Sequence, residues 1–192
     1  MLITNDWWCF PDGLDAETCA TLISWPEGEY EEGGTTGDLE GKRESEIKFI
    51  TSQWITDIIW PYMLDANEKA GWNFDIESVE AVQITKYGKD GYYGWHYDGG
   101  SDVFAKYRIP ENEFLNDYVR KLSMTIQLND DFQGGEFQIA NYEETVFWPE
   151  TPPGITKGSI IIFPSFKEHR ISPVTNGERH SLVAWFCGKP FR

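Results

Sequence analysis

Two segments near the N-terminus have the apolar spacing of a helix. In residues 14–25 the apolar side chains recur at helical intervals, at Leu14, Cys19, Leu22 and Ile23. Asp15 lies at the start of this segment, where its carboxylate can accept the free amide groups of a first turn. In residues 52–71 the same spacing covers Trp54, Ile55, Ile58, Ile59, Tyr62 and Met63. We therefore predict two helices, the second kinked at Pro61 and ended by Gly71.

From residue 76 onward the spacing changes to that of short strands. Runs rich in β-branched and aromatic residues alternate with turn residues, and they cover residues 76–87, 121–129, 135–140, 144–149, 158–164, 169–174 and 179–188. Seven or eight strands after a helical segment predict a mainly β chain of the α+β class. We expect a double-stranded β-helix, the cupin-like jelly roll of two sheets, with the helices packed on one outer sheet face.

The chain length of 192 residues suits one sizeable core, so we expect a single domain over residues 1–192. Within it, residues 1–75 would form the helical layer and residues 76–192 the jelly-roll core. Residues 27–46 are rich in Gly and Glu, which predicts a loop. Residues 99–120 form a long connection that is either a lid over a binding site or a solvated excursion.

The composition is typical of a folded, soluble protein. Hydrophobic residues make up 40% of the chain and aromatic residues 16%, which is too apolar for disorder. The sequence has no apolar run of about eighteen residues and no export signal, so we expect neither a membrane span nor secretion. Cys9, Cys19 and Cys187 are an odd set without metal-type spacing. They favour a reducing compartment, the cytoplasm.

The formal net charge of −16 limits the partners of this protein. Nucleic-acid binding depends on clustered Lys and Arg, and the sequence has no such cluster, so we do not expect a nucleic acid as partner. The charge favours solubility, and it suits a basic or neutral partner better than an acidic one.

Three polar residues form a candidate metal site. In residues 93–98 (YGWHYD), His96 and Asp98 are two apart, so on a strand their side chains share one face. His169 follows a strong strand and a Pro turn, where it can supply a third ligand. Two histidines and one carboxylate leave three positions of an octahedral iron open for reactants.

Arg179 and Ser181 form a candidate anion site. They are two apart on the last predicted strand, so they share one face, and His180 should point to the other. A guanidinium offers a planar fork of donors and the hydroxyl adds another, which suits a carboxylate. We predict a docking point for the far end of a dicarboxylic acid.

These motifs resemble those of the Fe(II)- and 2-oxoglutarate-dependent dioxygenases, in the branch similar to prolyl 4-hydroxylases. The resemblance runs from about residue 8 to the C-terminus, and its matching segments are residues 15–23, 66–75, 82–98 and 122–137, HRISPV with the following GER, and Trp185. It implies that His96, Asp98 and His169 bind Fe(II). It also implies that Arg179 pairs with the distal carboxylate of 2-oxoglutarate, where many members of the branch have Lys.

The same resemblance implies further residues around the cosubstrate. Tyr87 matches a tyrosine that contacts the cosubstrate in similar enzymes, Ser181 matches a serine found in several relatives, and Trp185 would form a wall of the pocket. Gln127 stands where some relatives have a tyrosine that reaches the same carboxylate, so its role stays open. O₂ is the second cosubstrate, and ascorbate is a further cofactor whose need the sequence leaves open.

The implied reaction is hydroxylation of an unactivated C–H bond, with release of succinate and CO₂. Asp98 favours hydroxylation over halogenation, since a small residue there would open a halide site. The most similar enzymes act on prolyl residues, so we expect a peptide or protein substrate. Aromatic residues that could seat an extended Pro-rich chain, although they are also typical of a core, are Tyr92, Tyr93, Trp95 and Trp148.

Two other functions stay open. The first is hydroxylation of a free amino acid or another small molecule, which needs a closed pocket where a peptide enzyme needs an open groove. The second is a non-catalytic binding module that has kept the fold, although a scaffold has no use for an intact ligand set. Nucleic-acid demethylases of the superfamily carry a second Arg six residues after the first, and this chain has Trp185 there.

Overall fold

The structure is a computed structural model that describes residues 5–34, 42–98, 106, 116–143 and 146–191. In chain order its elements are β1 (Trp8–Phe10), α1 (Ala16–Ile23), β2 (Glu31–Glu32), β3 (Arg43–Glu44), β4 (Glu46–Ile50), α2 (Gln53–Lys69), β5 (Ser78–Val79), β6 (Val82–Tyr87), β7 (Tyr92–His96), β8 (Val119–Gln127), β9 (Gln133–Gly134), β10 (Phe137–Glu143), β11 (Val146–Glu150), β12 (Ile160–Pro164), β13 (His169–Ile171), β14 (Val174–Asn176) and β15 (Arg179–Gly188). Most of the connection over residues 99–120 lies outside the described residues.

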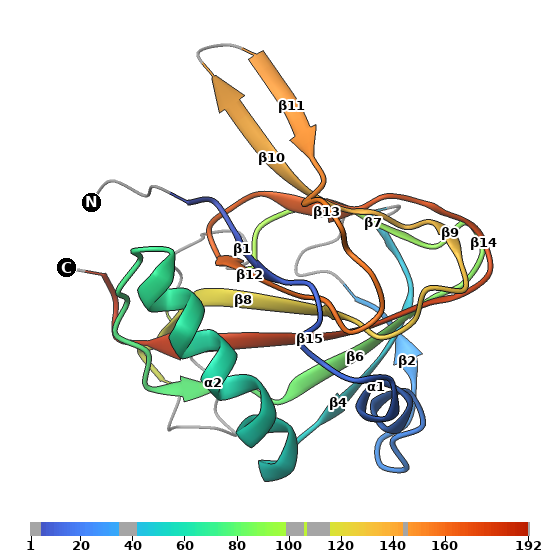
Figure 1. Cartoon of the computed structure of the whole chain (residues 1–192), viewed down its shortest axis with the longest axis horizontal. Helices are drawn as coiled ribbons and strands as arrows, with labels where there is room; N and C mark the ends of the chain where they lie inside the picture. Colours follow the sequence, from blue (N-terminus) through green and yellow to red (C-terminus); the bar gives the residue numbers. More distant parts are fainter. Residues whose placement is uncertain (1–4, 35–41, 99–105, 107–115, 144–145, 192) are drawn as a thin grey trace.

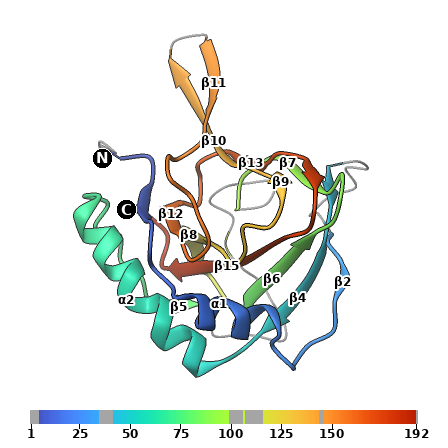
Figure 2. The ribbon, with the colours of Figure 1, turned by 45° about the vertical axis from the view of Figure 1, so that its right-hand side comes forward.

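Two antiparallel sheets form the body of the fold (Figures 1 and 2). The large sheet has the order β1-β12-β8-β15-β6-β4-β2, with β5 also paired to β15, and the small sheet has the order β11-β10-β13-β7-β3. Strands β14 and β9 form a separate pair. The expected two-sheet jelly roll with helices on one outer face is confirmed.

Alternation along the strands gives the large sheet two different faces. The face under the helices is apolar, and its buried side chains are Val82, Ile84, Leu122, Ile126, Ile160, Ile162, Leu182, Ala184 and Phe186. Helices α1 and α2 cover this face with Leu22, Ile55, Ile59 and Met63. Each large apolar side chain buried here stabilises the fold by roughly 1.5–3 kcal/mol. The other face points toward the small sheet and carries polar residues.

Local chemistry accounts for the start of α1 and the end of α2. The Asp15 carboxylate accepts a hydrogen bond from the Thr18 amide at 2.7 Å, which caps α1. Helix α2 continues through Pro61 as a single element. It ends before Gly71, whose φ of 74° is in the left-handed region that glycine adopts without strain.

The first 75 residues contain strands that the sequence did not predict, so the expected helical layer is incomplete. Strand β4 pairs with β6 in the large sheet, and β2 and β3 lie within the segment expected to be a loop. In β4 the polar residue Lys48 is buried, because its Nζ donates to the Trp25 carbonyl at 2.6 Å. Because a polar residue occupies this buried position, the sequence of β4 lacks the alternation of apolar and polar residues that predicts a strand.

The β10–β11 hairpin, at the edge of the small sheet, projects beyond the other strands (Figure 1). Its exposed large side chains are Tyr142, Val146, Phe147 and Trp148. The three cysteines are free thiols. Neither described helix is long and apolar enough to cross a membrane.

Candidate active site

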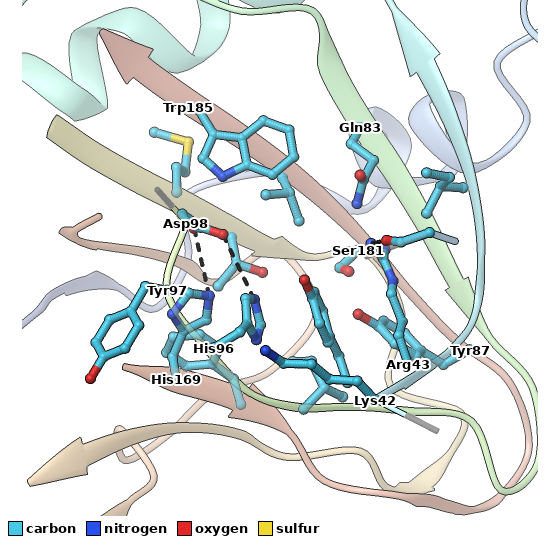
Figure 3. Close-up of a pocket in the computed structure, with 18 of the residues that line it drawn as sticks. Lys42, Arg43, Gln83, Tyr87, His96, Tyr97, Asp98, His169, Ser181 and Trp185 are labelled. Atoms are coloured by element: carbon cyan, nitrogen blue, oxygen red, sulfur yellow. Dashed lines mark hydrogen bonds and ion pairs between the residues drawn. The ribbon is translucent and has the colours of Figure 1, made fainter. Parts of the chain in front are cut away.

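A cavity of about 630 Å³ lies between the large and the small sheet (Figure 3). The large sheet contributes Gln83, Tyr87, Thr125, Ser181 and Trp185 to its walls, and the small sheet contributes Arg43, Tyr93, His96, His169 and Ile171. Figure 3 shows His96, Asp98 and His169 on one side of the cavity and Arg43, Tyr87 and Ser181 on the other. The volume exceeds what a small dicarboxylate needs and leaves room for part of a second reactant.

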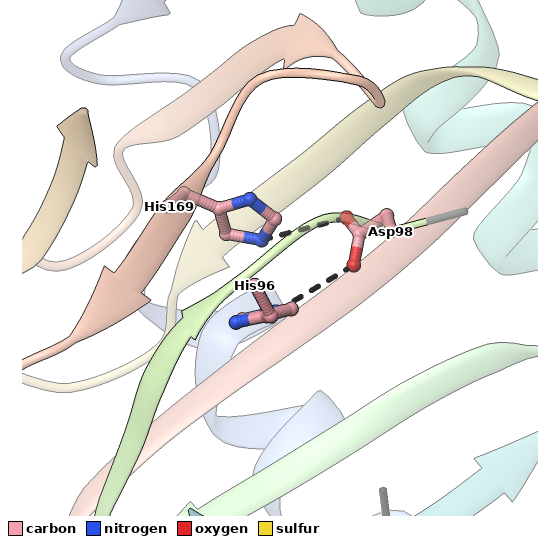
Figure 4. Close-up of side chains that lie close together, drawn as sticks. All are labelled: His96, Asp98 and His169. Atoms are coloured by element: carbon pink, nitrogen blue, oxygen red, sulfur yellow. Dashed lines mark ion pairs between the residues drawn. The ribbon is translucent and has the colours of Figure 1, made fainter. Parts of the chain in front are cut away.

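His96, Asp98 and His169 converge at one end of this cavity (Figure 4). His96 ends β7 and lies directly opposite His169 at the start of β13, and Asp98 follows β7. Asp98 Oδ1 is 3.7 Å from His96 Nε2, and Asp98 Oδ2 is 3.5 Å from His169 Nε2. One candidate ligand atom from each residue lies within 4.8 Å of the others, which suits a shared metal ion.

Backbone carbonyls orient both imidazoles. His96 Nδ1 is 2.8 Å from the Gly94 carbonyl, and His169 Nδ1 is 3.0 Å from the Lys167 carbonyl. Because a carbonyl only accepts, each Nδ1 carries the hydrogen and each Nε2 keeps its lone pair toward the cavity. This is the arrangement of metal-binding histidines whose other nitrogen is held by a backbone acceptor.

The electrostatics also suit a divalent cation. Burial and the neighbouring His169 lower the pKa of His96 to about 3, so this imidazole is neutral. Burial favours protonation of Asp98, but His169, His96 and Arg120 lower its pKa overall and keep it ionised. Asp98 Oδ2 is buried without a hydrogen-bond donor. Such an atom needs a partner, and a bound cation would supply it.

A β-bulge brings Tyr93 onto the same face as His96. His169 and Ile171 are two positions apart on β13, but their partners on β7, His96 and Tyr93, are three positions apart. The extra residue turns the Tyr93 ring into the cavity, where it stacks on His96 with 3.5 Å between ring centres. Burial raises the pKa of Tyr93 to about 12, so it remains a neutral phenol.

Arg120 braces the backbone of Asp98. Its Nη1 donates to the Asp98 carbonyl at 3.0 Å, and Glu80 accepts from its Nε and Nη2 at 2.8 and 2.7 Å. The guanidinium also covers the Trp185 ring at 3.9 Å. The backbone of Asp98 is therefore held by a guanidinium that is itself fixed by a bidentate ion pair with Glu80.

Ser181 lines the cavity opposite the metal cluster, and its hydrogen-bond partner Arg179 is not among the described residues that line the cavity. Arg179 is 1% exposed, and its Nη1 donates to Ser181 Oγ at 3.0 Å. Its Nε is buried without an acceptor, and none of the ion pairs in the described residues includes this guanidinium. A buried unpaired cation is unfavourable, so the arrangement suits an anionic ligand such as a carboxylate.

The other predicted cosubstrate residues differ in position. Tyr87 and Trp185 line the cavity, and Tyr87 lies opposite Arg179 in the register of β6 and β15. Gln127, at the end of β8, pairs with Ser181 of β15 but is not among the described residues that line the cavity. Its contact with the cosubstrate stays a prediction. His180 points away from the metal cluster and lies 2.8 Å from a Glu178 oxygen.

Sequence reasoning missed Arg43, Lys42, Arg120 and Glu80. The first two line the cavity from a segment that the composition predicted to be a loop. Arg120 and Glu80 are 40 positions apart in the chain, and no local pattern links them. Arg120 in β8 and Glu80 before β6 give only a weak signal in the sequence, because charged side chains in or near strands usually face solvent.

Comparison with known proteins agrees with this site. The profile of the 2OG-Fe(II) oxygenase superfamily matches residues 82–187, which include all three residues of the metal cluster. The chain belongs to the 2OG-Fe(II) oxygenase superfamily. It is therefore an enzyme of a class that takes Fe(II), 2-oxoglutarate and O₂.

Curated relatives of this oxygenase are PKHD-type hydroxylases. The chain is 42% identical to one from Hyphomonas neptunium, over 88% of this chain and 70% of that protein. It is 29% identical to another from Idiomarina loihiensis, over 91% of this chain and 74% of that protein. These matches support the prolyl hydroxylase-like branch that the motifs indicated.

Solved structures show the same fold. A Pseudomonas putida prolyl-4-hydroxylase superposes with a TM-score of 0.69 at 22% identity, and the match covers 95% of this chain and 93% of that one. A viral collagen prolyl hydroxylase from Paramecium Bursaria Chlorella virus-1 gives a TM-score of 0.65 at 19% identity, over 96% and 97% of the two chains. At these identities the likeness concerns the fold.

Proposed function

We propose that this oxygenase hydroxylates a prolyl residue of a peptide or protein and converts 2-oxoglutarate to succinate and CO₂. The observation that carries the proposal is the convergence of His96, Asp98 and His169 in a cavity whose wall also includes Ser181, the hydrogen-bond partner of the buried Arg179. The names of the relatives and structural neighbours support the prolyl class of substrate.

In this proposal His96, Asp98 and His169 hold the iron. When bound, Fe(II) with 2-oxoglutarate and O₂ supplies the oxidising power for C–H hydroxylation. Two imidazoles and one carboxylate would bring a single negative charge to the ion, so bound Fe(II) would stay positive enough to bind an anionic cosubstrate. Asp98 also occupies the position that a halide would need, which supports hydroxylation over halogenation.

Arg179, Ser181 and Tyr87 orient the cosubstrate. The Arg179 guanidinium has a buried donor without an acceptor, and the Ser181 hydroxyl that accepts from its Nη1 is on the cavity wall, so we place the distal carboxylate beside this pair. The Tyr87 phenol is buried, and burial raises its pKa, so it stays a neutral donor. Phe137, Phe163 and Trp185 line the same cavity and would exclude water.

Aromatic residues beside the cavity support a peptide substrate. Tyr97 lines the cavity and is 41% exposed, and the hairpin nearby exposes Tyr142 and Phe147. Tyr142 donates a hydrogen bond to Glu168. Burial, and to a smaller extent the charge of Glu168, raises the pKa of Tyr97. Phe147 packs on Trp95 at 5.3 Å between ring centres. Exposed aromatic rings of this kind suit an extended Pro-rich chain.

The test is turnover of a Pro-containing peptide library with Fe(II) and 2-oxoglutarate, with and without ascorbate. We expect succinate to form and one peptide class to gain one oxygen in the mass spectrum. Succinate formation that responds only to free amino acids or other small molecules would favour the small-molecule hydroxylase instead. A sample that shows no charge-transfer band with Fe(II) and 2-oxoglutarate under anaerobic conditions, and makes no succinate, would favour a binding module.

A further inference from the structure

Arg43 lines the cavity, and the proposed function above gives it no role. It lies on β3, directly opposite Tyr93 on β7, and its side chain points into the cavity (Figure 3). Its guanidinium carbon is 4.6 Å from the centre of the Tyr93 ring, and that ring also stacks on His96. One aromatic ring therefore links this guanidinium to the proposed iron ligands.

The hydrogen bonds of Arg43 leave one donor group unused. Its Nε donates to Ser45 Oγ at 2.7 Å, and its Nη1 reaches the Gly34 carbonyl at 3.4 Å. Its Nη2 is buried and has no acceptor. None of the ion pairs in the described ranges includes Arg43. A buried guanidinium group without an acceptor is costly unless a ligand pairs with it.

Arg179, on β15 of the large sheet, also has a guanidinium nitrogen without an acceptor. Its buried Nε also lacks an acceptor, and its guanidinium carbon is 5.6 Å from the centre of the Tyr87 ring. Both cations act on Tyr87. Burial raises the pKa of this phenol, while the charges of Arg43 and Arg179, and a weaker hydrogen-bond interaction with Arg43, oppose the rise. Two guanidinium groups with unused donors thus adjoin one tyrosine on the cavity wall.

We propose that Arg43 is a second cosubstrate-binding residue, whose Nη2 donates to the distal carboxylate of 2-oxoglutarate from the small sheet while Arg179 holds it from the large sheet. The inference rests on the proposed function, because it needs 2-oxoglutarate in this cavity. A carboxylate has two oxygens and can accept from two guanidinium groups at once. The cosubstrate carboxylate would then contact one residue of each sheet.

The test compares two probes that differ only at the far end. 2-Oxoglutarate carries the distal carboxylate, and 2-oxopentanoate has the same keto-acid group but a methyl group in its place. Each is titrated anaerobically into the Fe(II)-loaded protein, and the charge-transfer band gives its Kd. We expect the preference for 2-oxoglutarate over 2-oxopentanoate to fall by about tenfold or more in Arg43→Gln, since the variant loses a charged donor to the carboxylate.

Arg170→Gln is the matched control. Arg170 has its guanidinium carbon 4.7 Å from the Trp95 ring centre and its Nε 2.7 Å from Gln138 Oε1, so its contacts copy those of Arg43. It is not among the described residues that line the cavity, and its preference ratio should equal that of the unmodified protein. Arg43→Lys keeps the charge and should restore part of the preference.

The outcomes separate the two proposals. If the unmodified protein gives no band with 2-oxoglutarate, the proposed function fails. If it does bind, and Arg43→Gln weakens both probes equally or neither, Arg43 has only a structural role and this inference is wrong. If Arg43→Gln does not fold, the ratio measured in Arg43→Met decides, since methionine keeps much of the side chain but carries no charge, and an unchanged ratio there overturns the inference.

Discussion

The two faces of the large sheet are built from alternate residues of the same strands, yet one face packs against the helices and the other lines the cavity. On β8, Leu122 and Ile126 point to the helices and are fully buried among apolar side chains. Ser123 and Thr125, between them, are also buried but face the cavity side. The apolar face is held mainly by packing of hydrocarbon side chains, whereas the cavity face carries charged groups that packing cannot satisfy.

The difference teaches where to look for function. Buried side-chain atoms without a hydrogen-bond partner occur on both sides of the large sheet, but those of the Asp and Arg side chains, Asp98 Oδ2, Arg43 Nη2 and Arg179 Nε, are all at or beside the cavity. Leaving such atoms unpaired costs stability, so a sequence keeps them where a ligand completes them. The helical face should therefore govern stability, and the cavity face should govern ligand binding.

The largest effect is expected from His96→Ala. Removing one of three proposed ligands should abolish turnover and lower Fe(II) affinity by more than about 100-fold, because even an outer partner of a ligand costs 10–100-fold. The residue is at the cavity wall, so the thermal midpoint of the metal-free protein should change little. Turnover of 2-oxoglutarate by the variant at the normal rate would show that the ligand assignment is wrong.

Ile126→Ala tests the opposite face. Ile126 is 0% exposed beneath the helices, so its truncation should lower the free energy of unfolding by about 2–5 kcal/mol, measured by denaturant titration. Cosubstrate affinity below the unfolding midpoint should be retained. A variant with normal stability but weakened cosubstrate binding would contradict the division between the faces.

Arg120→Lys tests the brace on Asp98. Lysine keeps the charge but cannot hold Glu80 with two bonds and reach the Asp98 carbonyl at once, so Fe(II) affinity should fall by about 10–100-fold in an anaerobic titration. Lys86→Gln is the control, since it breaks a 2.5 Å ion pair to Glu46 on the same sheet outside the cavity. Equal iron affinities in the two variants would refute a positioning role.

Ser181→Ala should have the smallest effect. Arg179 Nη1 loses its acceptor, and the KM for 2-oxoglutarate should rise severalfold, by about 1 kcal/mol of binding, in a succinate assay. Ser172→Ala removes a buried hydroxyl bonded to Glu136 away from the cavity and should leave KM unchanged. An unaltered KM in Ser181→Ala would remove this serine from the anchor.

Prediction from the sequence was most successful where the pattern is local. Both helices, the cap at Asp15 and the strands after residue 76 follow from periodicity, which depends on neighbours a few residues away. Strand β4 was missed because the burial of Lys48 depends on a carbonyl 23 positions earlier. The short strands β2 and β3 have no pattern of their own and form only by pairing with existing strands.

By itself, the sequence determined the layered fold, the shared face of His96 and Asp98, and the pairing of Arg179 with Ser181, because a two-residue period puts such neighbours side by side. Only the tertiary structure decided that His169 lies opposite His96, that Arg120 reaches Asp98 and that Arg43 enters the same cavity. These contacts join segments from different strands and sheets. Their distances depend on strand register and bulges, and these are set when the sheets pack and not by local spacing.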